Sequence, residues 1–184
     1  MIDYSQKSAL IIENSSMMRT IIGEMLRHFN VHTIVKVTNA EEAIVATGEQ
    51  TFDFIILDFF LGSMDGGDFT RQLRRDETNR NRQTPILLVT AQPNHKEVMK
   101  ARDCGINEML AKPLSAKSLY TRLDAMLSRI RPFIISANYV GPCRRRRKLA
   151  PPDGVERRRK ALVLDNMTPP EPVETRLRGN LIEI

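Results

Sequence analysis

The sequence has no tryptophan, few other aromatic residues, only two cysteines and no long apolar run. Aromatic side chains make up 5% of its 184 residues, and Cys104 and Cys143 lie in dissimilar sequence surroundings. Small secreted proteins held together by disulfides are much richer in cysteine, so this pair is more typical of a reducing compartment. A membrane-spanning helix needs about 18 or more consecutive apolar residues. No such run is present, and we expect no membrane span.

Three other absences restrict the chemistry. A secretory signal begins with a basic stretch that is followed by an apolar segment, and residues 1–7 do not show this pattern. We therefore expect no secretory signal and a cytoplasmic location. His28, His32 and His95 share no metal-ligand spacing with either cysteine, which argues against a zinc site. No glycine-rich phosphate loop follows the first apolar run, which argues against nucleotide binding at that position.

Positive charge is present but unevenly distributed. The chain has 28 Lys and Arg against 22 Asp and Glu, a net charge of +6. Residues 1–128 hold 15 basic and 16 acidic side chains, whereas residues 129–184 hold 13 and 6. Seven of the ten prolines also lie after residue 128. We interpret residues 1–130 as one near-neutral domain and residues 131–184 as a basic, Pro- and Arg-rich tail that is extended or partly disordered.

The first 128 residues alternate short apolar runs with segments of helical spacing. The apolar runs predict five strands, over residues 9–12, 32–37, 52–57, 85–89 and 108–111. Apolar residues three or four apart predict five helices, over residues 18–29, 41–47, 68–75, 96–104 and 115 to about 130. Strands that alternate with helices form a parallel sheet with helices on both faces. The predicted class is α/β, with an irregular basic C-terminal extension.

Residues at the helix ends support these boundaries. Ser15 or Ser16 can cap the first helix, and Asn39 can cap the second. Gly105 suits the C-terminal end of the fourth helix, because glycine adopts the left-handed conformation without strain. The helices therefore begin and end on residues that favour those positions.

Polar side chains stand where the predicted strands end. Glu13 and Asn14 follow the first strand, Asp58 the third, Thr90 the fourth and Lys112 the fifth. The carboxyl ends of parallel strands meet at one edge of the sheet, so these side chains are expected to converge in one crevice. Their combination is much more specific than any one of them alone.

These residue types suit phosphoryl transfer. The carboxylate of Asp58 can attack phosphorus and form an acyl phosphate. The charge of the transition state is stabilised by positioned cations and hydrogen-bond donors, roles open to Lys112 and Thr90. Carboxylate and carbonyl oxygens also ligate Mg2+, so Glu13, Asp58 and the backbone carbonyl of Phe60 are candidate metal ligands.

Residues 8–128 resemble the receiver domain of bacterial two-component response regulators, of the chemotaxis-regulator type. The resemblance rests on five motifs: LIIENSSMMR at 10–19, FIILD at 54–58, MDG at 64–66, LVTA at 88–91 and KP at 112–113. It covers about two thirds of the chain, and the spacing of the aspartate, the threonine and the Lys-Pro pair is highly specific.

The resemblance implies a doubly wound, flavodoxin-like fold around a five-stranded parallel sheet. It also implies Mg2+-dependent transfer of a phosphoryl group to Asp58 from a sensor histidine kinase or a phosphotransfer protein. Thr90 would act as the switch and Lys112 as the phosphoryl contact, with a cis Lys112–Pro113 bond. Such a protein is a phosphoacceptor and not an enzyme in the usual sense, and it acts on a downstream protein target.

The sequence departs from the family pattern at three positions. Asn14 stands where the family usually has an acid that coordinates magnesium, so the affinity for Mg2+ should be reduced. Met109 stands where a switch-coupled aromatic is usual, which should alter the coupling to Thr90. Gly62 replaces a common proline in the loop after Asp58.

Two arginine runs mark the tail, and their role has three interpretations. The runs are Arg144, Arg145, Arg146 and Arg147, followed by Arg157, Arg158 and Arg159. They can form a solvated arm, bind nucleic acid or another polyanion, or dock onto a protein, including a second copy through the tail or the fourth-helix face. Docking is favoured narrowly over polyanion binding, because aromatic side chains for base stacking are scarce in the tail.

The sequence as a whole predicts a phosphorylation-controlled response regulator that switches protein partners in two-component signalling. One alternative is a regulator that binds nucleic acid or another polyanion through its arginine-rich tail. Another is a degenerate receiver that serves as a scaffold without being phosphorylated.

Overall fold

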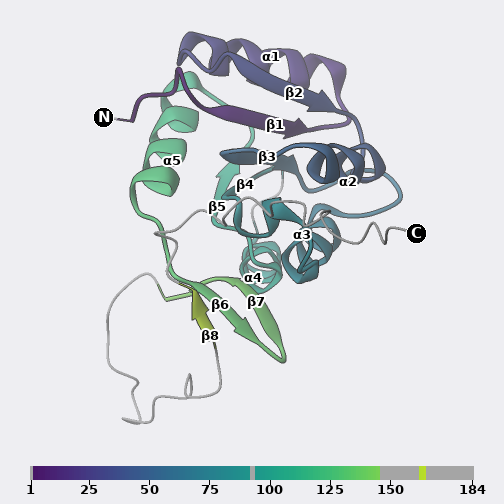
Figure 1. The fold of residues 1–184 in the computed structure, drawn as a ribbon. Helices are drawn as coiled ribbons and strands as arrows, with labels where there is room; N and C mark the ends of the chain where they lie inside the picture. Colours follow the sequence, from purple (N-terminus) through teal and green to yellow (C-terminus); the bar gives the residue numbers. More distant parts are fainter. Residues whose placement is uncertain (1, 92–93, 146–161, 165–184) are drawn as a thin grey trace, which may run out of the picture.

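A five-stranded parallel sheet forms the centre of the molecule (Figure 1). The structure is a computed structural model, and it describes residues 2–91, 94–145 and 162–164. The strands are β1 (Ser8–Ile12), β2 (Thr33–Val37), β3 (Phe54–Asp58), β4 (Ile86–Thr90) and β5 (Glu108–Ala111), in the spatial order β2-β1-β3-β4-β5. This order reverses direction beside β1, so the sheet is doubly wound and the predicted α/β fold is confirmed.

Helices cover both faces of the sheet. They are α1 (Ser16–His28), α2 (Ala40–Glu49), α3 (Gly66–Arg75), α4 (His95–Cys104) and α5 (Ala116–Ser128), with a 3-10 turn, η1 (Arg80–Gln83), before β4. Helices α1 and α5 pack on one face, and α2, α3 and α4 pack on the other. Within the described residues, no helix is both long and apolar enough to cross a bilayer.

Alternate residues of the central strands supply two separate cores. Leu10 and Leu57 pack beneath α2, α3 and α4, whereas Ile11 and Ile56 pack beneath α1 and α5. All of these side chains are almost completely buried. A strand that is buried on both faces needs a continuous apolar run, which is why these strands could be read directly from the sequence.

Helix caps account for small shifts in the boundaries. The Ser15 hydroxyl accepts a hydrogen bond from the backbone N–H of Met18, so Ser15 and not Ser16 caps α1. The Asp65 carboxylate caps α3 in the same way, which makes that helix begin at Gly66, two residues before the predicted start. Gly105 ends α4 at a φ of 95°, in the left-handed region that favours glycine.

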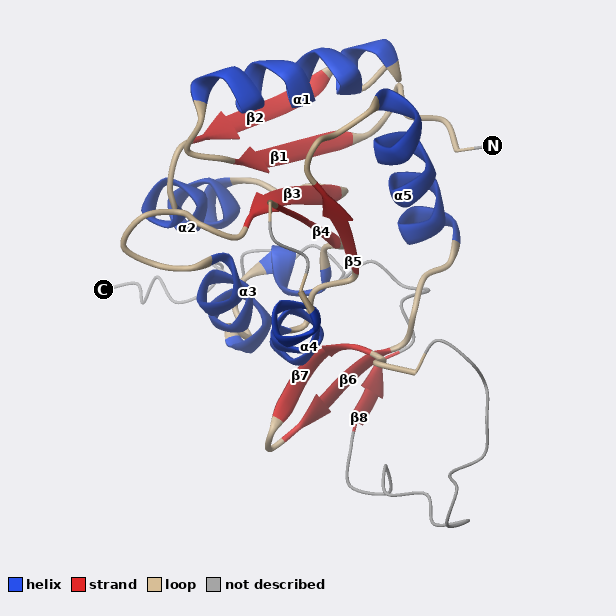
Figure 2. Cartoon of the chain, turned by 180° about the vertical axis from the view of Figure 1, so that it is seen from behind, coloured by secondary structure: helices blue, strands red, loops and turns tan. Residues whose placement is uncertain are grey.

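The first part of the tail forms strands, contrary to the prediction of an irregular extension. Strands β6 (Phe133–Ser136) and β7 (Tyr139–Pro142) form an antiparallel hairpin, and β8 (Leu162–Leu164) pairs with the other edge of β6 (Figure 2). The β6–β7 hairpin packs against α3 and α4. Phe133, Ile134 and Tyr139 are buried, which gives this segment a small core that its composition did not suggest.

One buried arginine and two glycines lie where the hairpin meets the receiver. The Arg74 guanidinium donates to the backbone oxygens of Gly105 (3.1 Å) and Thr84 (2.8 Å), and its centre lies 5.8 Å from the ring centroid of Phe133. A Cβ on Gly141 would lie 2.8 Å from the Gly105 Cα, too close for a side chain. Glycine at both positions therefore permits the two backbones to meet.

Candidate functional site

The carboxyl ends of β1, β3, β4 and β5 bring the predicted site residues to one edge of the sheet. Asp58 is the last residue of β3 and Thr90 the last of β4, whereas Glu13 and Lys112 follow β1 and β5 directly. The side chains of Glu13, Asp58 and Thr90 are buried. These four residues are 99 positions apart at most, and the parallel register alone places them together.

Asp58 is held by one backbone donor and one cation. Its Oδ1 accepts a hydrogen bond of 2.8 Å from the backbone N–H of Phe59, and its Oδ2 lies 3.3 Å from Nζ of Lys112. The residue as a whole is only 7% exposed. One carboxylate oxygen is thus fixed by the backbone, and the other faces the ammonium group.

Glu13 shares the same ammonium group. Nζ of Lys112 donates to Oε2 of Glu13 at 2.8 Å, and the Ser15 backbone N–H donates to Oε1 at 3.1 Å. Lys112 therefore bridges the carboxylates of Glu13 and Asp58. A cation between two buried acids compensates for part of their mutual repulsion.

The charges of this cluster are mutually dependent. Burial and the nearby charge of Glu13 raise the pKa of Asp58, and the attraction of Lys112 offsets this only in part. Burial disfavours the charged form of Lys112, but its hydrogen bond to Glu13 and its attraction to Asp58 outweigh that effect and raise its pKa. Lys112 is consequently protonated at neutral pH. A further positive charge near Asp58 would stabilise the ionised form of its carboxylate.

Thr90 connects the site to α4. Its buried hydroxyl donates to a carboxylate oxygen of Glu97 at 3.3 Å. Its backbone oxygen accepts a hydrogen bond of 2.8 Å from the backbone N–H of Lys112. Thr90 is paired in register with Ala111 of β5. The Lys112–Pro113 peptide bond is cis, as the resemblance implied.

Other predicted residues lie at the margin of the site or outside the described chain. Asn14 is exposed, and its backbone oxygen accepts a hydrogen bond from Arg19 at 2.8 Å. Phe60 is 53% exposed and is joined by a β-bridge to Asp65, while Met109 is half-buried against the core. Of the tail arginines, Arg146, Arg147, Arg157, Arg158 and Arg159 lie outside the described residues.

The oxygen donors of the site suit a divalent cation. Glu13 and Asp58 contribute two carboxylates, and Mg2+ in proteins is commonly held by one or two carboxylates together with water and phosphate oxygens. Within the described residues, no three His, Cys, Asp or Glu side chains come together as a metal cluster. Asn14, the further side-chain ligand expected from the sequence, is neutral and would add an amide oxygen but no charge.

Sequence reasoning missed three residues that shape the site and its surroundings. Glu97 accepts the hydrogen bond of Thr90, and Lys100 pairs with Asp65 at 2.6 Å while lying 5.1 Å from the centroid of the Phe59 ring. Arg74 is the third, and it is fully buried. The position of Glu97 in the first turn of α4, soon after Thr90, is a signal from which this contact could have been predicted. The residues around Arg74 in the sequence give no sign that its side chain is buried.

Comparisons with known proteins agree on one family. The model of the response regulator receiver domain matches residues 9–124. Chemotaxis protein CheY-3 of Vibrio cholerae is 27% identical over 121 residues, which span 66% of this chain and 92% of that protein. The two-component response regulator PhoP of Pseudomonas aeruginosa is 30% identical over 137 residues, 72% of this chain and 57% of that one.

Solved structures give the same result for the fold. The receiver domain of a sensor histidine kinase from Pseudomonas aeruginosa, which has a magnesium ion coordinated in its active site cleft, is 27% identical with a TM-score of 0.60. The match covers 67% of this chain and 98% of that one. The β6–β7 hairpin, from Phe133 onward, lies beyond the residues that the family model matches.

Proposed function

Because the chain belongs to the response regulator receiver domain family of two-component signalling, we propose that Asp58 accepts a phosphoryl group and that this modification switches its partners. Receiver domains of this family bind Mg2+ and interact with histidine kinases or phosphotransfer proteins and with downstream targets. The observation that carries the proposal is the position of Lys112, whose Nζ lies 3.3 Å from Asp58 and 2.8 Å from Glu13.

The proposed step is an in-line displacement at phosphorus. An oxygen of Asp58 forms the new bond to phosphorus, and the bond between phosphorus and the donor histidine nitrogen breaks, with its electron pair leaving on that nitrogen. Lys112 remains protonated and donates to a phosphoryl oxygen. The backbone N–H of Phe59 keeps the attacking carboxylate oriented through its 2.8 Å hydrogen bond.

Four residues would hold the magnesium ion. They are Glu13, Asp58, Asn14 and, through its backbone oxygen, Phe60. When bound, Mg2+ neutralises negative charge on the carboxylates and on the transferred phosphoryl oxygens. Glu13 is the principal acid of this set besides Asp58, and because Asn14 brings no charge we propose a reduced metal affinity.

Thr90 is the proposed switch. In the structure its hydroxyl donates to Glu97, the first-turn acid of α4. A phosphoryl group on Asp58 offers a more highly charged acceptor, and a Thr90 hydroxyl that turns to it gives up the Glu97 hydrogen bond. The resulting change in α4 shifts the population of conformations on the face formed by α4 and β5.

Intact mass spectrometry tests the proposal. The full chain is incubated with MgCl2 and a small acyl phosphate as donor, and one added phosphoryl group is expected. Asp58→Ala should abolish the adduct, whereas the matched variant Asp68→Ala, on the exposed side of α3, should retain it. Chelation of the metal with EDTA should suppress the adduct in the unsubstituted chain.

Two results would contradict the proposal. One is the absence of any adduct on a protein that unfolds cooperatively, which would favour the degenerate-receiver alternative. The other is an adduct of equal yield after Asp58→Ala, which would place the phosphoryl group on a different residue.

A further inference from the structure

A groove lined by arginines lies on the face formed by α4, β5 and the end of α5, beside the β6–β7 hairpin. Two neighbouring hollows share Asn107, Glu108 and Arg131 among their lining residues, and we treat them together as one groove. We call it the arginine groove, after the six arginines that line it: Arg102, Arg122, Arg129, Arg131, Arg144 and Arg145. Four of the six lie after residue 124, beyond the family match.

The charge of the groove is strongly positive. Glu108 is the one acid among its lining residues, and it lies 3.5 Å from Arg122. Asp103, beside the groove, pairs with Arg102 at 3.0 Å and with Arg144 at 2.8 Å. Six arginines against these two carboxylates leave a net charge of +4 on the arginine groove and its rim.

Several of the guanidinium groups are held in place. Arg131, which lines both hollows, donates to the backbone oxygen of Cys143 at 3.0 Å and to that of Asn107. The guanidinium carbon of Arg144 lies 4.7 Å from the ring centroid of Tyr139. Side chains that are already ordered lose less conformational entropy when a ligand binds. The β6–β7 hairpin thus fixes part of this positive surface in the free protein.

We propose that the arginine groove binds the phosphodiester backbone of a nucleic acid. Guanidinium groups match the geometry of phosphate oxygens, and a nucleic acid carries a negative charge at every nucleotide. An acidic peptide rarely has such an unbroken row of charges.

The composition of the groove also indicates how the nucleic acid is recognised. Its apolar lining consists of aliphatic side chains and methionine, including Val98, Met109 and Met126. No aromatic ring is among the lining residues of the described chain. Binding should therefore depend on phosphate contacts and be independent of base sequence.

Fluorescence anisotropy with the full chain tests the proposal. The probe is a labelled single-stranded DNA of ~20 nucleotides, titrated at about 50 to 200 mM salt. Arg129→Ala combined with Arg145→Ala should weaken binding at least about tenfold and reduce the slope of log K against log salt by about 1 to 2. Both side chains are exposed and on the groove, so the fold should be retained.

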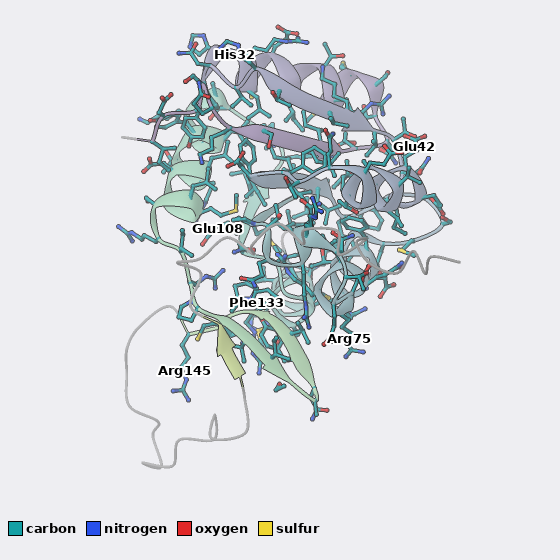
Figure 3. The ribbon with its side chains drawn as sticks, viewed as in Figure 1. His32, Glu42, Arg75, Glu108, Phe133 and Arg145 are labelled. Atoms are coloured by element: carbon teal, nitrogen blue, oxygen red, sulfur yellow. The ribbon has the colours of Figure 1, made fainter. Side chains whose placement is uncertain are left out.

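A matched double variant controls for overall charge. Arg75→Ala with Arg80→Ala removes the same two charges from exposed positions outside the groove, and it should change the affinity less than about twofold. In Figure 3, Arg75 lies at α3, to the right of Glu108 and Arg145, and it is not among the residues that line the groove. Thermal unfolding followed by circular dichroism verifies that both variants fold.

Four outcomes would overturn the proposal. They are no binding at the lowest salt, equal weakening by the two double variants, a dinucleotide that competes as well as the long probe, and a glutamate peptide of the same length that competes as well as DNA. Loss of affinity confined to the groove variant, with a reduced salt slope, supports it. None of these outcomes depends on whether Asp58 is phosphorylated.

Discussion

At the scale of single residues, Asn14 leaves the acidic site with two carboxylates that share one lysine. Glu13 and Asp58 both contact Lys112, and burial and Glu13 raise the pKa of Asp58. A third carboxylate beside them would increase the repulsion in the free protein and would increase the attraction for a divalent cation. We therefore expect the residue at position 14 to set how strongly the proposed phosphorylation of Asp58 depends on Mg2+.

Asn14→Asp tests this effect directly. We expect the Mg2+ concentration that half-saturates the phosphorylation rate to fall about tenfold, because the ligand set gains a charge. Saturating Mg2+ should also raise the unfolding midpoint of the variant more than that of the unsubstituted chain. Asn138→Asp, at the exposed turn of the β6–β7 hairpin, is the control and should leave both measurements unchanged. If the half-saturating Mg2+ concentration is the same in the unsubstituted chain and in both variants, Asn14 does not limit metal binding.

At the scale of secondary structure elements, Arg74 ties α3 to the segments around η1 and the turn between α4 and β5, beside the Phe133 ring of the hairpin. Its guanidinium donates to the backbone oxygens of Arg82, Thr84 and Gly105 and to the side chain of Asn107. Arg74→Met keeps most of the side-chain volume but leaves these acceptors without their donor. We expect a loss of about 3 kcal/mol or more in the free energy of unfolding, measured in urea.

The neighbouring residue provides a matched control for that loss. Arg75 is exposed on the same helical turn, so Arg75→Met should change the free energy of unfolding by less than about 0.5 kcal/mol. Similar losses in the two variants would mean that the buried hydrogen bonds of Arg74 do not stabilise the fold.

The contrast between the sheet and the hairpin shows which elements a sequence reveals. Each strand of the sheet is a local apolar run, and Asp58, Thr90 and Lys112 could be placed together because a parallel sheet aligns its strand ends. The hairpin instead meets the receiver where Phe133 lies against Arg74 and where Gly105 and Gly141 approach closely. These residues are far apart in the sequence, and an arginine on a helix is usually exposed. The composition of the tail therefore concealed its ordered part.

At the scale of the whole molecule, β5 links the proposed phosphorylation site to the arginine groove. Lys112 follows its last residue, and Glu108 and Met109 at its beginning line the groove. The two ends are about 10 Å apart along a strand of this length, which is close to the Debye length at physiological salt. A doubly charged phosphoryl group on Asp58 should therefore still weaken the attraction of the groove for a polyanion.

We accordingly expect phosphorylation to lower the affinity for single-stranded DNA by about two- to fivefold at low salt, less at high salt. The measurement compares DNA binding with and without a phosphoryl analogue such as beryllofluoride in the presence of Mg2+. Binding free energies are reciprocally linked, so DNA should weaken binding of the analogue by the same factor. Asp58→Ala should bind DNA normally and lose the effect of the analogue. Unchanged DNA affinity in a protein that demonstrably binds the analogue would mean that the receiver and the arginine groove work independently.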